Sequence, residues 1–189
     1  MIKFKELKQY LSRIARVSVC HEADLSYENY ILISDIPEGK YDEMYVYGVG
    51  MIDVEFPLDV YARPGVEVPA ETSLSDGYFI GAGLEVMVRE TPRDDIKRSD
   101  EKVLKFKDLR KFLQLFGGFS VVRKEDWSSK EYEKTADIPY EYDELFVYGI
   151  GMEDKSKGME DFKGAGDSIV TKQMVIVLSE TPRQLVGES

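Results

Sequence analysis

The sequence predicts an α+β fold: a tandem repeat of two similar modules, each with one N-terminal helix followed by about four mainly antiparallel strands. Three observations support this prediction. Four sequence blocks occur twice in the same order, an amphipathic helical pattern opens each copy, and short segments rich in β-branched and aromatic residues follow it. Four ordered matches are too many for coincidence, so an internal duplication is the simplest explanation.

The matching blocks locate the two copies along the chain of 189 residues. Residues 2–11 match 104–113, 35–37 match 137–139, 41–51 match 142–152, and 90–93 match 180–183. The last two blocks lie 39 positions apart in the first copy, from Met51 to Glu90, but 28 apart in the second, from Met152 to Glu180. The extra residues lie within 56–81, a proline-containing insertion. Insertions of this length in a compact domain are often functional.

A charged segment separates the two copies. Residues 94–101 contain one apolar side chain, that of Ile96, and this composition is typical of a linker. The predicted domains are therefore residues 1–97, which include the insertion at 56–81, and residues 102–189. Each has a size at which a single hydrophobic core is workable.

The helical pattern at the start of each copy places apolar residues three or four positions apart, with charged residues between them. This stripe consists of Phe4, Leu7, Leu11 and Ile14 in the first copy and of Phe106, Leu109, Leu113 and Phe116 in the second. Each copy is therefore expected to begin with an amphipathic helix. Gly117 and Gly118 are expected to end the second helix, because glycine is common just beyond helix C-termini.

The expected strands of the first copy are residues 16–22, 30–35, 44–54 and 84–90. Antiparallel pairing is expected because a parallel connection between consecutive strands needs a dozen or more residues. The third strand is apolar on both faces, so both faces should be covered. Its own helix covers one face, and the candidates for the other are the insertion, the other copy or another subunit. Gly48 and Gly50 leave a furrow that lets another backbone pack closely.

The composition excludes several classes of protein. The chain has 36 acidic and 25 basic residues, a formal net charge of −11, and enough apolar residues, 43%, to form a core. An acidic surface repels phosphate backbones, so we expect no direct contact with nucleic acid. One cysteine and one histidine exclude a disulfide scaffold and a Cys/His zinc site. No apolar run has the length of a signal peptide or a membrane span, which predicts a cytoplasmic protein without membrane contact.

The motifs that resemble catalytic or cofactor sites lack essential parts. Cys20 and His21 are adjacent on an expected strand, so their side chains point to opposite faces and cannot form a nucleophile and base. The Gly48-x-Gly50 motif lacks the third glycine and the following helix of a nucleotide-binding loop. The sequence therefore predicts a protein that is not an enzyme and has no cofactor and no metal site.

Two charged motifs have an expected structural role. The adjacent acids 42–43 and 143–144 follow a turn, where carboxylates are usually solvated instead of facing each other across a cleft. Arg93 and Arg183 end the repeated Glu-Thr-Pro-Arg block, whose proline stops the last strand. Each arginine is expected to pair with an acid of its own copy, for instance Asp42 or Asp143.

The sequence predicts a non-enzymatic protein-binding module that contacts a partner through sheet faces and aromatic loops. The candidate contact residues are Tyr61, Tyr78, Ile31, Ile33 and Trp127. Tyr61 and Tyr78 lie in the insertion, Trp127 lies in a loop, and the two isoleucines belong to an apolar patch that the second copy has lost. The expected partner is another protein, and the candidates include a second copy of this chain in a homodimer.

Two alternatives remain open. The first is an acidic nucleic-acid mimic from a phage or mobile element that inhibits a DNA-binding protein. Such a mimic needs carboxylates nearly as dense as duplex phosphates, whereas here lysines interrupt the acids. The second is a small-molecule sensor or enzyme with a pocket between the repeats.

Overall fold

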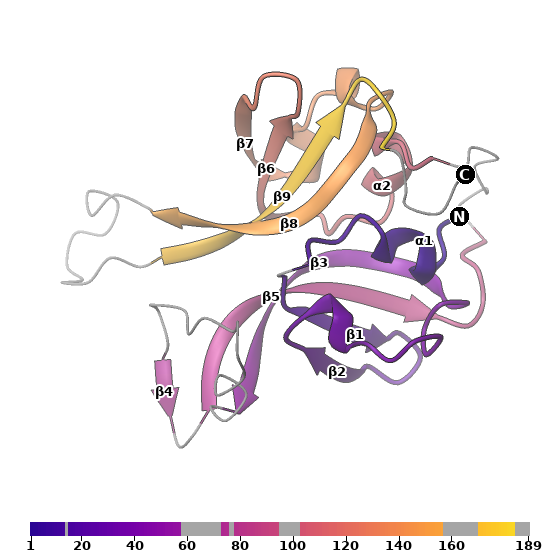
Figure 1. Ribbon diagram of the computed structural model, residues 1–189, viewed down its shortest axis with the longest axis vertical. Coiled ribbons are helices and arrows are strands. Elements are labelled where there is room, and N and C mark those ends of the chain that lie inside the picture. The colour runs from indigo at the N-terminus through magenta and orange to yellow at the C-terminus, as the bar shows by residue number, and fades with distance from the viewer. Residues whose placement is uncertain (14, 58–72, 76–77, 95–102, 157–169, 184–189) are drawn as a thin grey trace.

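The computed structural model describes residues 1–13, 15–57, 73–75, 78–94, 103–156 and 170–183. In these ranges the chain is α+β, with few helices and two sheets that occupy separate lobes (Figure 1). The predicted fold class is confirmed at this level.

The first half of the chain forms one sheet. Its elements are α1 (Phe4–Lys8), β1 (Val17–His21), β2 (Ser26–Tyr30), the 3-10 helix η1 (Ile33–Asp35), β3 (Tyr45–Pro57), β4 (Ser73–Ser75) and β5 (Tyr78–Arg89). The strand order is β2-β1-β5-β3, and the short β4 pairs with β5. Neighbouring strands are antiparallel except β1 and β5, which are parallel.

The second half forms the other sheet. Its elements are α2 (Phe106–Arg110), β6 (Phe116–Arg123), β7 (Ser129–Lys134), the 3-10 helices η3 (Thr135–Asp137) and η4 (Tyr140–Tyr142), β8 (Phe146–Ser156) and β9 (Val170–Ser179). The order β7-β6-β9-β8 and the strand directions correspond to those of the first sheet. The parallel pair of each sheet escaped prediction because its strands are not consecutive, and the strands that lie between them in the chain make the connection.

Both α-helices are shorter than their apolar stripes suggest. Each has five residues, and no helix in the described ranges is long and apolar enough to cross a membrane. The prediction that Gly117 and Gly118 end the second helix is wrong, because α2 ends at Arg110 and both glycines lie in β6. So short a helix has little stability of its own. The residues after each helix do not continue it. Leu11 forms a β-bridge with Ile150, and Leu113 forms one with Val49, so each pairs with the opposite half of the chain.

The second strand of the first half also lies elsewhere than predicted. A strand at 30–35 is wrong, since β2 ends at Tyr30 and residues Ile33–Asp35 form η1. The Asp35 carboxylate accepts a hydrogen bond from the Leu32 N–H at 3.3 Å and closes this turn. At the edge of the sheet, β2 is mostly exposed and polar, so no apolar alternation marks it in the sequence.

The segment that follows α1 crosses to the second sheet. Ser12 N–H donates to the Ile150 carbonyl at 2.7 Å, and Ile150 N–H donates to the Tyr10 carbonyl at 2.7 Å. Residues 10–12 thereby add a short parallel edge to β8, the outermost strand of that sheet.

The segment that follows α2 makes the reciprocal contact with the first sheet. Val49 N–H donates to the Phe112 carbonyl at 2.7 Å, and Gln114 N–H donates to the Val49 carbonyl at 2.9 Å. Residues 112–114 thus extend the sheet beyond β3. We call residues 10–12 and 112–114 the crossing segments. Among the described residues, the opposite half of the chain lies against the edge of this third strand, β3, and residues 58–72 and 76–77 of the insertion are outside the described part.

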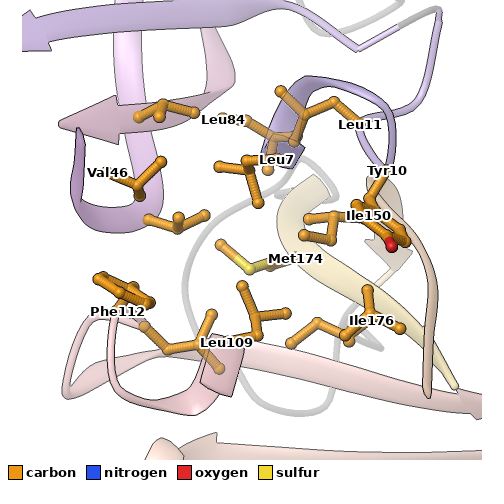
Figure 2. Packing of buried hydrophobic residues seen from close by; sticks show 14 of the residues in the cluster. Leu7, Tyr10, Leu11, Val46, Leu84, Leu109, Phe112, Ile150, Met174 and Ile176 are labelled. Carbon is orange, nitrogen blue, oxygen red and sulfur yellow. The ribbon is translucent and has the colours of Figure 1, made fainter. Parts of the chain in front are cut away.

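Buried apolar side chains from both halves form one hydrophobic cluster. Figure 2 shows part of it, with Leu7, Val46, Leu84, Leu109, Met174 and Ile176 among the labelled side chains. Each of these six is at most 1% exposed. The two halves therefore share their interior, and this shared core fixes the sheets against each other.

Candidate functional site

The connections from β1 to β2 and from β6 to β7 are built in the same way. The Asp24 Oδ1 atom accepts hydrogen bonds from Ser26 N–H at 3.0 Å and from Ser26 Oγ at 2.7 Å. In the second half, Asp126 Oδ1 accepts from Ser128 N–H at 2.9 Å and from Ser128 Oγ at 2.6 Å. These bonds to serine lower the pKa of both aspartates, because they favour the ionised carboxylate. Each connection is thus held by the same aspartate-serine turn.

One large apolar residue stands between the aspartate and the serine of each turn. These residues, Leu25 and Trp127, both have a φ of 56°, and no other non-glycine residue in the described ranges has a positive φ. In this left-handed region the Cβ atom crowds the backbone, so glycine or asparagine usually occupies it. A leucine or tryptophan here costs on the order of 1 kcal/mol of stability. We call residues 22–25 and 124–127 the hairpin tips.

The strained side chains at the tips point into solvent. Leu25 is 62% exposed and Trp127 is 68% exposed, so neither gains much free energy from burial. Stability alone does not account for a large apolar side chain at an exposed, strained position. Backbone strain of this kind clusters at ligand clamps and other functional sites, and aromatic residues in such places act as anchors of protein interfaces.

The two tips differ in their surroundings. Beside the first tip, the half-exposed Tyr27 donates its hydroxyl hydrogen bond to Glu85, which is 7% exposed, at 3.0 Å. Hydrogen bonding to the Cys20 thiol, burial and Glu85 all raise the pKa of Tyr27. Beside the second tip, the Lys124 ammonium lies 4.1 Å from the ring centroid of Tyr148. The two tips therefore have the same backbone conformation but different neighbouring side chains.

The structure describes the side chains of three of the five predicted contact residues, Trp127, Ile31 and Ile33. Trp127 is exposed at a tip, whereas Ile31 and Ile33 are only 7% and 8% exposed, and Ile33 belongs to the shared core. Tyr61 lies outside the described residues. Tyr78 is the first residue of β5, opposite Pro57 and Ser75, and its side chain also lies outside the described part. The exposed Trp127 and the two buried isoleucines therefore do not form one exposed patch.

Sequence reasoning missed Leu25, although a signal for it was present. Asp24-Leu25-Ser26 and Asp126-Trp127-Ser128 occupy matching positions, and each places an apolar residue in a turn. Turn residues are usually small or polar, so an apolar residue inside a matched Asp-x-Ser turn indicates exposure.

The second acid of each adjacent pair forms ion pairs with two lysines. Glu43 bridges Lys3 and Lys5, and these two lysines hold the pKa of Glu43 down at about 2. Glu144 bridges Lys105 and Lys107 in the same way, at 3.1 Å each. Among the described residues, no group of three or more His, Cys, Asp or Glu side chains is arranged to hold a metal ion.

The expected pairing of Arg183 with Asp143 is wrong. The Arg183 Nη1 atom donates to the carbonyls of Gln9 and Tyr148, both at 3.1 Å, and Asp143 pairs with Arg110 at 2.7 Å instead. Arg110 lies on α2, whose backbone is already bonded to the Asp143 carbonyl through Lys107, so it is the nearer cation. In the first half, Arg93 Nη1 likewise donates to a carbonyl, that of Tyr47, at 3.3 Å.

The Gly-x-Gly motif marks the place where the halves touch. A Cβ atom at Gly50 would lie 1.8 Å from Gln114 Cδ, and one at Gly151 would lie 3.3 Å from Ser12 Cβ. The expectation that these glycines admit a neighbouring backbone is confirmed by the crossing segments. Gln114 uses this space to reach across the sheet, where its Nε2 atom donates to Glu85 Oε2 at 2.7 Å.

Gly50→Ala is expected to lower the free energy of unfolding by about 1–3 kcal/mol, because the Gln114 amide must leave and Glu85 loses a charge-assisted hydrogen bond. Combined with Gln114→Ala, the glycine substitution should cost much less. Urea unfolding of both single variants and the double variant measures this coupling. Gly149→Ala is the control, since its Cβ would have only an ordinary 3.8 Å contact with the Tyr10 carbonyl. Equal losses for Gly50→Ala and Gly149→Ala would contradict the expectation.

The chain matches no protein-family model, and neither the curated proteins nor the solved structures contain a significant match to it.

Proposed function

We propose that this chain is a non-enzymatic protein-binding protein that arose by tandem duplication, and that its two hairpin tips are contact points for another protein. The observation that carries the proposal is the exposed left-handed residue at each tip, Leu25 and Trp127. The duplication is supported by the corresponding strand orders, the matching turns and the reciprocal crossing segments.

The chemistry of the tips favours a protein partner. An apolar side chain that is strained and exposed in the free chain regains free energy when it enters an apolar pocket, and tryptophan is the residue most enriched among interface anchors. The formal net charge of −11 disfavours a phosphate backbone as the partner.

Two observations support this proposal over the alternatives. Lysines pair with Glu28, Glu43 and Glu144, so these carboxylates do not form the unbroken anionic array that a nucleic-acid mimic needs. The side chains of the shared core that lie between the halves are almost all apolar (Figure 2), whereas a ligand pocket needs polar groups that orient the ligand.

Substituting both tips with asparagine separates a binding role from a structural one. Asparagine tolerates the left-handed conformation, so Leu25→Asn and Trp127→Asn should leave stability unchanged or raise it by up to about 1 kcal/mol. The same variants should weaken partner binding, by about tenfold or more for Trp127→Asn.

The measurement starts with affinity capture from the native host by the wild-type chain and by the double variant. Proteins that only the wild type retains are identified by mass spectrometry and purified, and their dissociation constants are then measured. Leu115→Asn is the control, because Leu115 is 74% exposed but lies on ordinary backbone. The proposal fails if the double variant binds the same proteins equally well. It also fails if the double variant is less stable by more than about 1 kcal/mol, which would make the tips structural elements.

A further inference from the structure

A pocket of about 430 Å³ opens at the end of the first sheet, apart from the hairpin tips. It is lined by Tyr47, Arg89, Thr91, Pro92, Arg93 and Asp94. Tyr47 lies on β3, and Arg89 is the last residue of β5. The other four lining residues are 91–94, which follow β5 after Glu90. Its volume falls within the range of roughly 300–1,000 Å³ that is common for small-molecule sites.

Two guanidinium groups lie over one aromatic ring in this pocket. The Cζ atom of Arg89 lies 5.8 Å from the ring centroid of Tyr47, and that of Arg93 lies 5.0 Å from it. Arg93 is fixed by its hydrogen bond to the Tyr47 carbonyl, and Arg89 by a 3.6 Å contact of its Nε atom with Glu22. Pro92 lies three residues beyond the end of β5 at Arg89 and cannot donate a ladder hydrogen bond there. A hydrogen bond therefore holds Arg93 at the ring, whereas Arg89 is held more loosely by its ion pair with Glu22.

This arrangement suits an oxyanion. Two cations on one ring repel each other, and an anion bound between them would reduce that repulsion further than the 3.6 Å contact of Arg89 with Glu22 does. The planar guanidinium fork matches the paired oxygens of a carboxylate or a phosphate group. The Arg89 side chain is 40% exposed, so a ligand in solvent can reach it.

The second half offers a matched comparison. Its corresponding ring, Tyr148, has Lys124 and Arg183 over it, at 4.1 and 5.6 Å. Ser179 stands where the first half has Arg89, and its hydroxyl donates to Glu125 at 2.9 Å. The pair of arginines on one tyrosine is therefore a feature of the first half.

We propose that the pocket binds a small ligand through a carboxylate or phosphate group, which the guanidiniums of Arg89 and Arg93 hold above the Tyr47 ring. Asp94 lines the same pocket, and its exposed carboxylate opposes an anion there. The proposal therefore predicts that removing the Asp94 carboxylate strengthens anion binding. Glu22 of the first hairpin tip contacts Arg89, but neither Leu25 nor Trp127 lines the pocket, so either proposal stands if the other fails.

The test is a titration of the full-length, ¹⁵N-labelled chain with inorganic phosphate and, separately, with acetate, at an ionic strength held constant with sodium chloride. We expect saturable shifts of the amide resonances of Tyr47, Arg89, Thr91, Arg93 and Asp94. Arg89→Gln should weaken binding by about tenfold or more. Asp94→Asn should tighten binding by about two- to fivefold, because it removes a like charge. Arg183→Gln, the corresponding arginine of the second half, should leave the affinity unchanged.

Each outcome of the titration either supports or overturns the proposed anion site. Saturation by phosphate alone supports a phosphate-bearing ligand, and saturation by both anions supports a carboxylate as well. The proposal is overturned if neither anion saturates the wild-type chain, or if the shifts spread over surface lysines instead of the pocket. Unchanged affinity in Arg89→Gln, or weaker binding in Asp94→Asn, would also overturn it. Damage to the fold cannot imitate the result, since Asp94→Asn is expected to gain affinity.

Discussion

Leu7→Ala is expected to lower the free energy of unfolding by about 2–5 kcal/mol, and to do so for the whole chain in one cooperative step. Leu7 lies on α1 in the first half, is 0% exposed, and belongs to the cluster that contains Leu109, Met174 and Ile176 of the second half. Truncating it leaves a cavity in an interior that both sheets use, so neither half keeps its stability while the other unfolds.

Differential scanning calorimetry measures this expectation, with Leu109→Ala as the matching variant in the second half. Leu109 is also 0% exposed, and it occupies the position on α2 that corresponds to Leu7 on α1. Both variants should move one and the same transition, with equal calorimetric and van't Hoff enthalpies. Two transitions, of which each variant moves only one, would show that the halves unfold as independent domains.

The second large loss of stability is expected on substitution of Arg110, whose guanidinium donates four hydrogen bonds. Its Nε atom donates to Asp143 Oδ1 at 2.7 Å. Its Nη1 and Nη2 atoms donate to three backbone carbonyls at 2.8–3.1 Å, those of Thr135, Ile138 and Pro139. Its side chain is 14% exposed. Arg110 therefore connects α2 to the 3-10 segment before β8.

Arg110→Met is expected to lower the free energy of unfolding by about 3 kcal/mol, since Asp143 loses its cation and three carbonyls lose their donors. Arg110→Lys should recover little of this loss, because a single ammonium cannot replace the planar fork. Lys8→Met is the control at the matching position of α1 and should have a much smaller effect. Chemical denaturation of the three variants measures the differences. Wild-type stability in Arg110→Lys would show that only the charge matters.

The features that the sequence predicted correctly depend on local patterns. β-branched and aromatic runs located β1, β3 and the second part of β5, because such residues fit a half-buried strand. The apolar residues on both faces of β3, together with Gly48 and Gly50, correctly indicated that another part of the molecule packs closely there. Part of the predicted insertion, residues 56–57 and 78–81, lengthens β3 and β5.

The features that the sequence did not predict depend on contacts between distant residues. Leu11 and Leu113 fit a helical stripe, and only the presence of a sheet edge from the opposite half makes an extended backbone favourable for them. The sequence predicts Ile31 and Ile33 as contact residues because the second copy is polar at these positions, but the fold buries both side chains. The left-handed backbone at Leu25 and Trp127 has no local signature beyond the aspartate-serine turn.

The reciprocal crossing segments have a consequence for the newly synthesised protein. β3 ends at Pro57, but the strand edge at Val49 gains its partner only when Gln114 has been made. At about 5–20 residues per second, the ribosome needs roughly 3–12 s to cover that stretch. During this interval the nascent first half exposes an open, apolar strand edge, which is the kind of surface that pairs with other chains. Slower translation of the second half should therefore increase aggregation, and a chaperone that covers strand edges should reduce it.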